Sequence, residues 1–237
     1  MSVFAHLVER LADLLQPLFG ASAGAAAIVL FTALVRLLLH PLSRAAARGQ
    51  KARAELQPRV AELRRKHAKD PERLKRAVLE LHAEEKVSPL SGCLPSLLQL
   101  PAFFLLYHVF SSSEVGGRAN GLLSHQLLAA PLGGRWADAL GDGGLLGGAG
   151  LVYAVLFAVV AGVATFSYRL TRRSMAAHPV APAGDGEQVP GVGAITRVMP
   201  FMSFFTLVTV AVVPLAAALY VVTSTTWSAV ERAVLQR

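Results

Sequence analysis

The sequence lacks most of the features on which enzymes and disulfide-rich proteins are built. Its 237 residues contain one cysteine, Cys93, which excludes an intramolecular disulfide framework and a cysteine-based zinc cluster. Only 16% of the residues are charged, with 15 Asp and Glu against 23 Lys and Arg. The metalloprotease motif H-E-x-x-H, the Walker A motif and the dinucleotide motif G-x-G-x-x-G are absent. We therefore expect a protein that is not an enzyme and that uses no cofactor and no metal ion.

Long apolar runs are what the sequence has instead. Hydrophobic residues make up 54% of the chain and the mean hydropathy is +0.49, which is too apolar for an ordinary soluble domain. Apolar blocks occupy residues 25–42, 89–110, 150–170 and 199–230, and runs near 20 residues indicate transmembrane helices. The last block would form roughly 48 Å of helix, longer than the ~30 Å hydrocarbon core, and Pro214 divides it into two spans.

This pattern predicts an all-α polytopic membrane protein with five transmembrane helices, at residues 23–42, 89–110, 150–170, 198–213 and 214–231. The other predicted segments are an N-terminal interfacial helix (1–22), a cytoplasmic two-helix hairpin (43–88), an extracytoplasmic loop (111–149), a cytoplasmic linker (171–197) and a cytoplasmic C-terminus (232–237). The basic residues set the orientation, since 13 Lys and Arg lie in the hairpin segment. Because positive loops stay in the cytoplasm, we expect the N-terminus outside and the C-terminus inside.

The first residues, Met1–Phe19, have the spacing of an amphipathic helix. Apolar residues recur every three or four positions, whereas Glu9, Arg10 and Asp13 lie between them. This pattern favours a helix that lies on the membrane surface. A cleaved signal peptide fits less well, because the segment has no basic start and positive charge follows the apolar run.

The charged segment after the first span is rich in Ala, Leu, Glu, Lys and Arg, all good helix formers. Two thin apolar stripes run through it, one formed by Leu56, Val60 and Leu63 and the other by Leu74, Val78 and Leu81. Asp70-Pro71 lies between the stripes and is typical of a helix stop and restart. We expect an antiparallel helical hairpin that moves relative to the membrane part; a solvated charged loop is the alternative.

Arg36 stands in the middle of the first apolar run, F-T-A-L-V-R-L-L-L-H-P-L at Phe31–Leu42. A charge at mid-helix costs about 2.5–3.5 kcal/mol on insertion scales. Leu42 lies roughly 9 Å further along the helix, so full snorkelling to the headgroups would be strained. No Asp or Glu lies within the apolar runs, so we expect no ion pair for Arg36 within the chain. Partial snorkelling and a water-filled cavity remain as explanations.

Two further polar side chains lie within the predicted spans. Thr32 is one helical turn before Arg36, and Gln99 lies at mid-depth of the second span between Pro95 and Pro101. An intramembrane Gln most often holds helices together by hydrogen bonding, whereas the two prolines bend the helix that carries it. From the residues alone, Thr32 and Gln99 could serve either helix packing or a polar cavity.

Four motifs follow one another over nearly the whole chain. They are T-A-L-V-R-L-L-L-H-P-L at Thr32–Leu42, S-P-L-S-G-C-L-P-S-L-L-Q-L-P-A-F-F-L-L-Y at Ser88–Tyr107, V-M-P-F-M at Val198–Met202 and P-L-A-A-A-L-Y-V-V-T-S at Pro214–Ser224. In this order the motifs resemble the YidC/Oxa1/Alb3 family of membrane protein insertases. The chain is most similar to the short Gram-positive or actinobacterial type, although V-P-L-A replaces the F-P-A-G turn of many relatives.

The resemblance implies a function, a site and a set of partners. The function would be to help nascent proteins enter and fold in the bacterial plasma membrane. The site would be a hydrophilic groove, open to the cytoplasm and the lipid and closed to the outside, in which Arg36 binds the client and Thr32 and Gln99 are candidates for the polar lining. The implied partners are nascent membrane-protein clients and the lipid bilayer, with the SecYEG translocon and the ribosome as further candidates.

Other function classes have weaker support in the sequence. Residues 20–24 match the G-x-S-x-G pattern of serine hydrolases, but that motif requires a strand-to-helix turn with His and acidic partners. A small transporter or channel is the main alternative, although transporters usually contain internal repeats and none is seen here. Direct nucleic-acid recognition is disfavoured, because the sequence has no nucleic-acid-binding motif and no aromatic platform.

Overall fold

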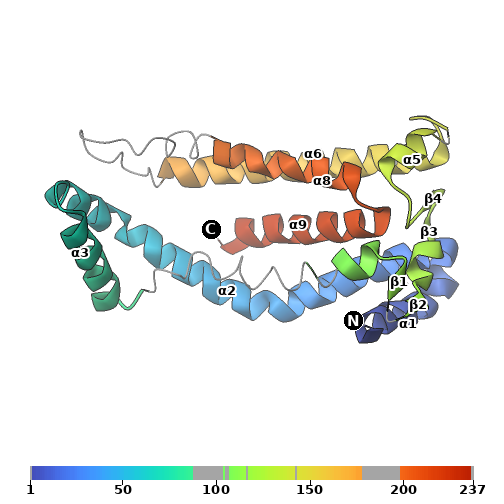
Figure 1. The fold of residues 1–237 in the computed structure, drawn as a ribbon, viewed down its shortest axis with the longest axis horizontal. Coiled ribbons are helices and arrows are strands. Elements are labelled where there is room, and N and C mark those ends of the chain that lie inside the picture. The colour runs from blue at the N-terminus through green and yellow to red at the C-terminus, as the bar shows by residue number, and fades with distance from the viewer. Residues whose placement is uncertain are drawn as a thin grey trace.

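The computed structural model describes residues 2–87, 104, 107–115, 117–141, 143–177 and 198–235. Most of the predicted second span, 89–110, lies outside the described residues, as does residue 99. The described chain is predominantly helical, and most of its long helices lie side by side along one long axis (Figure 1).

Helices α1 and α2 form a tight pair at one end of the molecule. Helix α1 is Ser2–Phe19, the short 3-10 helix η1 is Gly20–Ser22, and α2 is Ala23–Lys66. Gly20 has a φ of 53°, a left-handed conformation that glycine adopts without a steric cost, and there the chain turns back. Val8 and Ala12 of α1 are buried, whereas Leu14 and Leu18 are exposed. The predicted amphipathic helix is therefore present; its place on a membrane surface stays a prediction.

Helix α2 continues without a break through the predicted boundary at residue 42. It has 44 residues, which corresponds to about 66 Å. Both Pro41 and Pro58 lie inside it. Each removes one backbone hydrogen bond, but the strong helix formers around them carry the helix onward. The first span and the first helix of the hairpin are thus one element in the structure.

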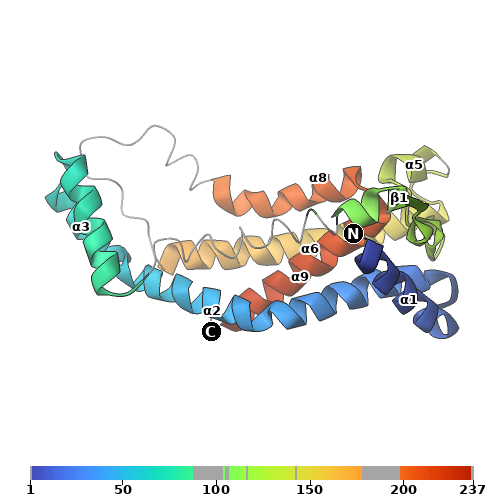
Figure 2. The same cartoon turned by 60° about the horizontal axis from the view of Figure 1, so that its bottom comes forward.

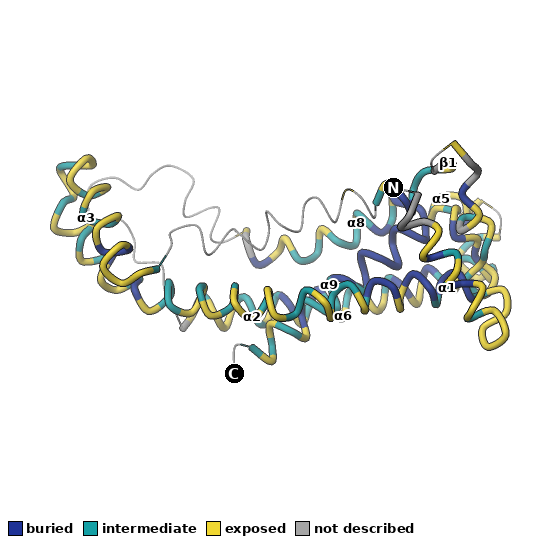
Figure 3. The backbone as a smooth tube through the Cα atoms, turned by 90° about the horizontal axis from the view of Figure 1, so that it is seen from below, coloured by how far each residue is buried: buried dark blue, intermediate teal, exposed yellow. Residues whose placement is uncertain are grey.

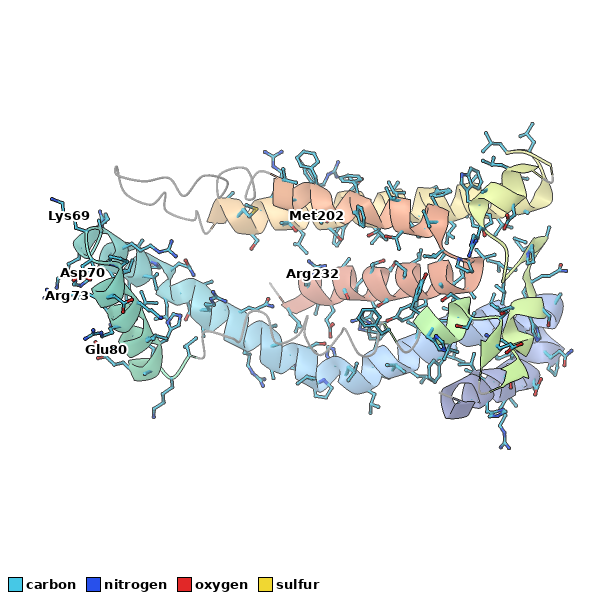
Figure 4. All side chains as sticks on the ribbon, viewed as in Figure 1. Lys69, Asp70, Arg73, Glu80, Met202 and Arg232 are labelled. Atoms are coloured by element: carbon cyan, nitrogen blue, oxygen red, sulfur yellow. The ribbon has the colours of Figure 1, made fainter. Side chains whose placement is uncertain are left out.

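The cytoplasmic hairpin predicted from the apolar stripes is completed by α3, Pro71–Glu84. Asp70 caps this helix by accepting a 3.0 Å hydrogen bond from the Arg73 amide, as the Asp70-Pro71 signal indicates. Where α3 packs on α2, the buried side chains are Leu56, Val60, Leu81 and His82. Arg59 and Glu85 form a salt bridge beside them. Figures 2 and 4 place α3 and the turn residues Lys69, Asp70 and Arg73 at the end of the molecule opposite α1.

The segment predicted as a loop contains small ordered elements. Strands β1 (Glu114–Val115) and β2 (Arg118–Ala119) pair antiparallel, as do β3 (Gln126–Leu127) and β4 (Ala130–Pro131), with η2 (Gly121–Ser124) between the hairpins and α5 (Trp136–Gly141) after them. The buried Asn120 side chain donates hydrogen bonds of 2.7 and 3.0 Å to the carbonyls of Val109 and Ser112. This segment is therefore folded against the ends of the helices.

The remaining helices complete the bundle. They are α6 (Gly148–Ala177), the 3-10 helix η3 (Met199–Phe204), α8 (Phe205–Val212) and α9 (Leu215–Leu235). The last apolar block divides at Val213-Pro214, as predicted, because Pro214 cannot continue the hydrogen-bond pattern of α8. Helix α9 lies between α2 on one side and α6 and α8 on the other (Figure 1).

Two helical stretches among the described residues are long and apolar enough to cross a membrane, His6–Lys66 and Gly148–Ala176; Pro200–Val212 is a shorter apolar helix. Large apolar side chains are exposed along these helices. They include Leu34, Leu37 and Leu38 on α2, Val155, Val159 and Phe166 on α6, and Phe205, Val208 and Val212 on α8. Such outward apolar faces require an apolar surrounding, and they are those of a membrane protein.

Candidate functional site

The two ends of the helical bundle differ in how they are closed. We call the end that carries residues 112–147 the loop end and the end that carries α3 the hairpin end. Figure 3 shows that buried residues gather at the loop end. On α9 every residue from Leu215 to Val222 is buried, whereas beyond it only Ser224 and Ala229 are. On α2 the buried residues run from Ala23 to Thr32 and resume only at Leu56.

Backbone hydrogen bonds close the loop end. The first amides of α9 have no partners within their own helix, and the folded loop supplies them. Leu215 donates to the Gly134 carbonyl and Ala216 to the Leu132 carbonyl, both at 2.9 Å. The Tyr153 hydroxyl of α6 donates to the same Gly134 carbonyl at 2.7 Å. The loop thus joins α6 and α9, and the fully buried Leu132 fills the space beneath it.

Arg36 lies just beyond the last buried turn of α2, toward the hairpin end. Its guanidinium donates a hydrogen bond to the Ser224 hydroxyl of α9, and Ser224 is only 6% exposed. Arg36 itself is half-buried. The side chains of Tyr220 and Glu231, both on α9, are close enough to interact with it electrostatically. A cation therefore lies between the apolar parts of two helices, and among the described residues its hydrogen-bond partner is a neutral hydroxyl.

A second polar contact joins the same two helices. His40 Nδ1 and Glu231 Oε1 are 2.6 Å apart, and His40 donates because a carboxylate only accepts. Glu231 is 11% exposed at its side chain and His40 is 39% exposed. Glu231 is the last residue of the predicted fifth span, one residue beyond the apolar run, and it interacts electrostatically with Arg36. Among the described residues, however, Arg36 is hydrogen-bonded to Ser224 and forms no ion pair with Glu231.

The structure separates Thr32 from the accessible part of α2. Thr32 is 1% exposed, and its hydroxyl donates to the Ile28 carbonyl of its own helix at 2.7 Å. Its polarity is therefore satisfied within the helix. Gln99, the other candidate for the polar lining, lies outside the described residues. Among the three predicted site residues, the described structure brings only Arg36 to the point where the burial of α2 ends.

Three polar residues near Arg36 were missed by the sequence analysis: Ser224, His40 and Glu231. Their spacing along the sequence could have indicated that they lie on shared helix faces. His40 follows Arg36 by one helical turn, and Glu231 follows Ser224 by two, so each pair lies on one helix face. What the spacing could not supply is that these two faces meet. Among the described residues, no group of three or more His, Cys, Asp or Glu could hold a metal ion.

Aromatic clusters flank the apolar part of α6. Trp136 packs on Tyr153 and Phe157 near the loop end, with ring centroids 5.6 and 5.2 Å apart. Toward the hairpin end, Tyr168 packs on Phe201 at 5.2 Å, and the Arg172 guanidinium lies 5.7 Å from the Tyr168 ring centroid. Tyr and Trp are enriched where helices meet the two membrane–water interfaces. Tyr153 and Tyr168 are separated by about 22 Å of helix.

The chain is similar to a protein family as a whole and to individual members of it. A family model described as "60Kd inner membrane protein" matches residues 14–237. A Membrane protein insertase YidC of Clostridium perfringens (strain 13 / Type A) is 43% identical over 95 residues, which cover 40% of this chain and 40% of that relative. The protein of the same name from Anaeromyxobacter sp. (strain Fw109-5) is 42% identical over 101 residues, 43% of this chain and 18% of the relative. The matched stretches thus cover less than half of these curated relatives.

Proposed function

The chain belongs to the 60Kd inner membrane protein family, that of YidC, Oxa1 and Alb3, and from this premise we propose that it is a membrane protein insertase. It would help nascent proteins to enter and fold in the bacterial plasma membrane. Its relatives in Clostridium perfringens and Anaeromyxobacter carry that activity in their names. The proposed partners are nascent membrane-protein clients and the lipid bilayer, with the SecYEG translocon and the ribosome as further candidates.

The observation that carries the proposal is the position of Arg36. A guanidinium on an apolar helix is costly unless water or a partner compensates it. Within the described part of the chain, the Arg36 guanidinium donates one hydrogen bond, to Ser224, which uses one of its five N–H donors; we propose that the others serve water or a client. Because the burial of α2 and α9 ends near this point, we propose that a hydrated groove reaches Arg36 from the hairpin end. Such a groove would attract acidic or polar client segments.

The mechanism that follows needs no covalent chemistry. A client's polar flank crosses the bilayer most slowly where it must leave water for hydrocarbon. Water around Arg36 would shorten the low-dielectric path, and the positive charge would lower the energy of an acidic flank within it. Together η3 and α8, Met199–Phe204 and Phe205–Val212, form roughly 24 Å of helix, shorter than the hydrocarbon core. This mismatch would thin the bilayer locally and shorten the path further.

The proposed placement in the membrane has five spans, with the loop end outside and the hairpin end in the cytoplasm. The hydrogen bonds from Leu215 and Ala216 to the loop support a groove that is closed on the outer side. The aromatic clusters around Tyr153 and Tyr168 support interfaces at those two depths. The basic residues of the hairpin segment support its cytoplasmic location.

Thr32 and Gln99 remain proposals for the polar lining of the groove. Since the Thr32 hydroxyl is bound to Ile28, Thr32 would act on a client only after a local opening of α2 against its neighbours. Replacing Thr32 or Gln99 with Leu should therefore reduce insertion less than replacing Arg36 with Ala does.

The test uses the purified full chain in phospholipid vesicles and a small single-span client added during its synthesis. The insertase proposal predicts a protease-protected client in excess of that in protein-free vesicles, with no leak of a trapped ion reporter. A channel or transporter would instead release the reporter or move a solute without inserting the client. An equal protected fraction with and without the protein would refute the proposal.

A further inference from the structure

The pair formed by His40 and Glu231 lies in line with the Arg36–Ser224 contact. Both contacts join α2 to α9, and the paired residues are 188 and 191 positions apart in the sequence. His40 is one turn further toward the hairpin end than Arg36, roughly 6 Å along α2. A chain segment that approaches Arg36 from the hairpin end along these two helices therefore comes near the Glu231 carboxylate.

Glu231 differs from the other acidic residues of the described chain in its surroundings. It is the one Asp or Glu on α9, and the next acid on α2 is Glu55, in the hairpin. At 11% exposure its carboxylate has lost most of its water, which is costly unless a donor replaces it. His40 supplies that donor. The carboxylate also interacts electrostatically with Arg36, but Arg36 is hydrogen-bonded to Ser224 instead.

This arrangement keeps the only acid of α9 from neutralising Arg36. If the carboxylate moved onto the guanidinium, the two would form an ion pair and Arg36 would lose its attraction for an acidic client. If the carboxylate were absent, the field of Arg36 would reach the hairpin end at full strength. The hydrogen bond to His40 gives a case between these two. The negative charge of Glu231 is present near Arg36, but it is not paired with the guanidinium.

From these contacts we infer that Glu231 is a specificity-determining residue of the proposed insertase and that His40 is its positioning residue. Glu231 sets the strength with which Arg36 attracts acidic client flanks, and His40 holds the carboxylate away from Arg36. The inference rests on the proposed function. It assigns to this chain a selection against strongly acidic flanks, exerted before the client reaches Arg36.

The experiment compares two single-span clients in the vesicle assay. The first carries two acidic residues in its translocated flank, and the second carries the corresponding amides. The quantity measured is the ratio of acidic to neutral client inserted. Glu231→Gln should raise this ratio about five-fold, the effect of one partly buried unit charge on another, through greater insertion of the acidic client. Glu231→Asp should stay close to the wild type.

The His40 variants test the positioning role, and the ratio of acidic to neutral client should change in the opposite direction. His40→Leu releases the carboxylate toward Arg36 and should lower the ratio, whereas His40→Leu combined with Glu231→Gln should raise it as Glu231→Gln alone does. Glu55→Gln is the matched control, because it removes the same charge roughly 22 Å from His40 along α2. It should leave the ratio unchanged.

The possible outcomes separate this inference from the proposed function. If the wild type inserts the neutral client no better than protein-free vesicles, the insertase proposal fails and the inference falls with it. If the wild type inserts both clients but Glu231→Gln leaves the ratio unchanged, or changes both clients equally, Glu231 is only structural. Should Glu231→Gln fail to accumulate as a folded protein, the ratio in His40→Leu decides, and an unchanged ratio there overturns the inference.

Discussion

At the scale of single residues, the protein satisfies polar side chains in two ways. The hydroxyls of Thr32, Thr223 and Thr225 donate to carbonyls one turn earlier in their own helices, so each is independent of the rest of the fold. Arg36 is satisfied differently, because its partner Ser224 comes from another helix, α9. The energetic consequences of removing these groups should differ accordingly.

Ser224→Ala should destabilise the protein more than Thr223→Ala does. Removing Ser224 takes a hydrogen bond from a charged, half-buried donor, and such bonds contribute about 1.5–3 kcal/mol. Removing the Thr223 hydroxyl frees only a carbonyl that keeps its helical partner. The measurement is the melting temperature of each purified variant in the same detergent. Equal melting temperatures for the two variants would show that the Arg36–Ser224 bond contributes little.

At Arg36, the sign of the charge should matter more than the shape of the side chain. Arg36→Lys should retain most of the insertion activity, because Lys is also cationic although it lacks the planar fork. Arg36→Ala should reduce insertion of clients with acidic flanks roughly tenfold, about 1.4 kcal/mol, and spare neutral ones. Arg36→Glu should be worse than Arg36→Ala for the acidic clients, because it repels them.

The Arg36 series is measured in vesicles that contain equal amounts of folded protein. Similar activity of the Lys, Ala and Glu variants with both kinds of client would contradict the electrostatic role. Arg36 would then be a snorkelling residue, and the groove would act by hydration and membrane thinning alone.

At the scale of the elements, the hairpin and the membrane helices are joined by one continuous helix, and the described residues show little packing between them. Helix α3 packs on α2 through a thin apolar stripe, and the tip carries charged residues such as Lys69 and Arg73 (Figure 4). A unit with so few buried contacts opens at low free-energy cost. The hairpin is therefore suited to docking a nascent chain or its targeting machinery, and we expect the bundle to fold without it.

Replacing residues 55–84 with a short linker should leave a folded membrane bundle and impair client insertion. The reason is that the deletion removes α3 and the apolar stripe of α2 on which α3 packs. It removes none of the contacts between α2 and α9 near Arg36. The measurements are the amount of protein in the membrane fraction and the activity in vesicles. Loss of the protein from the membrane would instead show that the hairpin is structural.

The loop end depends on a close approach between α2 and the folded loop. A Cβ placed on Gly24 would lie 2.7 Å from the His125 Cβ and 3.2 Å from the Leu132 side chain. Gly24→Ala should therefore force the loop outward, at about 1–3 kcal/mol for overpacking. By contrast, a Cβ placed on Gly162, in the exposed middle of α6, would meet no atom within 4 Å.

Gly162→Ala is thus the matched control and should be neutral or stabilising by about 0.5–1 kcal/mol, because alanine favours the helix. The two melting temperatures in detergent should shift in opposite directions or differ by several degrees. A Gly24→Ala protein as stable as the wild type would mean that the loop yields freely, and the loop end would then be a poor seal.

At the scale of the whole molecule, the distribution of charge should set the orientation in the membrane. The hairpin end carries most of the Lys and Arg, and positive segments are retained in the cytoplasm. In a Cys93→Ser background, cysteines introduced at Ser2 and Lys69 should differ in their reaction with an impermeant thiol reagent on intact cells. We expect labelling at Ser2 only, and the reverse pattern would overturn the topology.

Features that depend on local composition could be predicted from the sequence alone. Apolar runs predict spans wherever they occur, Pro214 interrupts the last run because it lacks an N–H, and Asp70-Pro71 separates α2 from α3 because both residues favour a helix start. These signals act within a few residues, so no knowledge of the fold is required. The continuation of α2 past residue 42 was not predicted. A change from apolar to charged residues changes the surroundings of a helix, from lipid to water, but it does not end the helix.

The surroundings of Arg36, in contrast, follow from tertiary packing. Ser224 and Glu231 come from a helix nearly 190 positions away, and they meet Arg36 and His40 because α2 and α9 run parallel and in contact. The loop carbonyls that receive the first amides of α9 likewise come from a distant segment. Helix faces can be derived from spacing, but which faces meet depends on how the whole bundle packs. The sequence therefore identified the charge at the site, and the packing of the helices decided its partners.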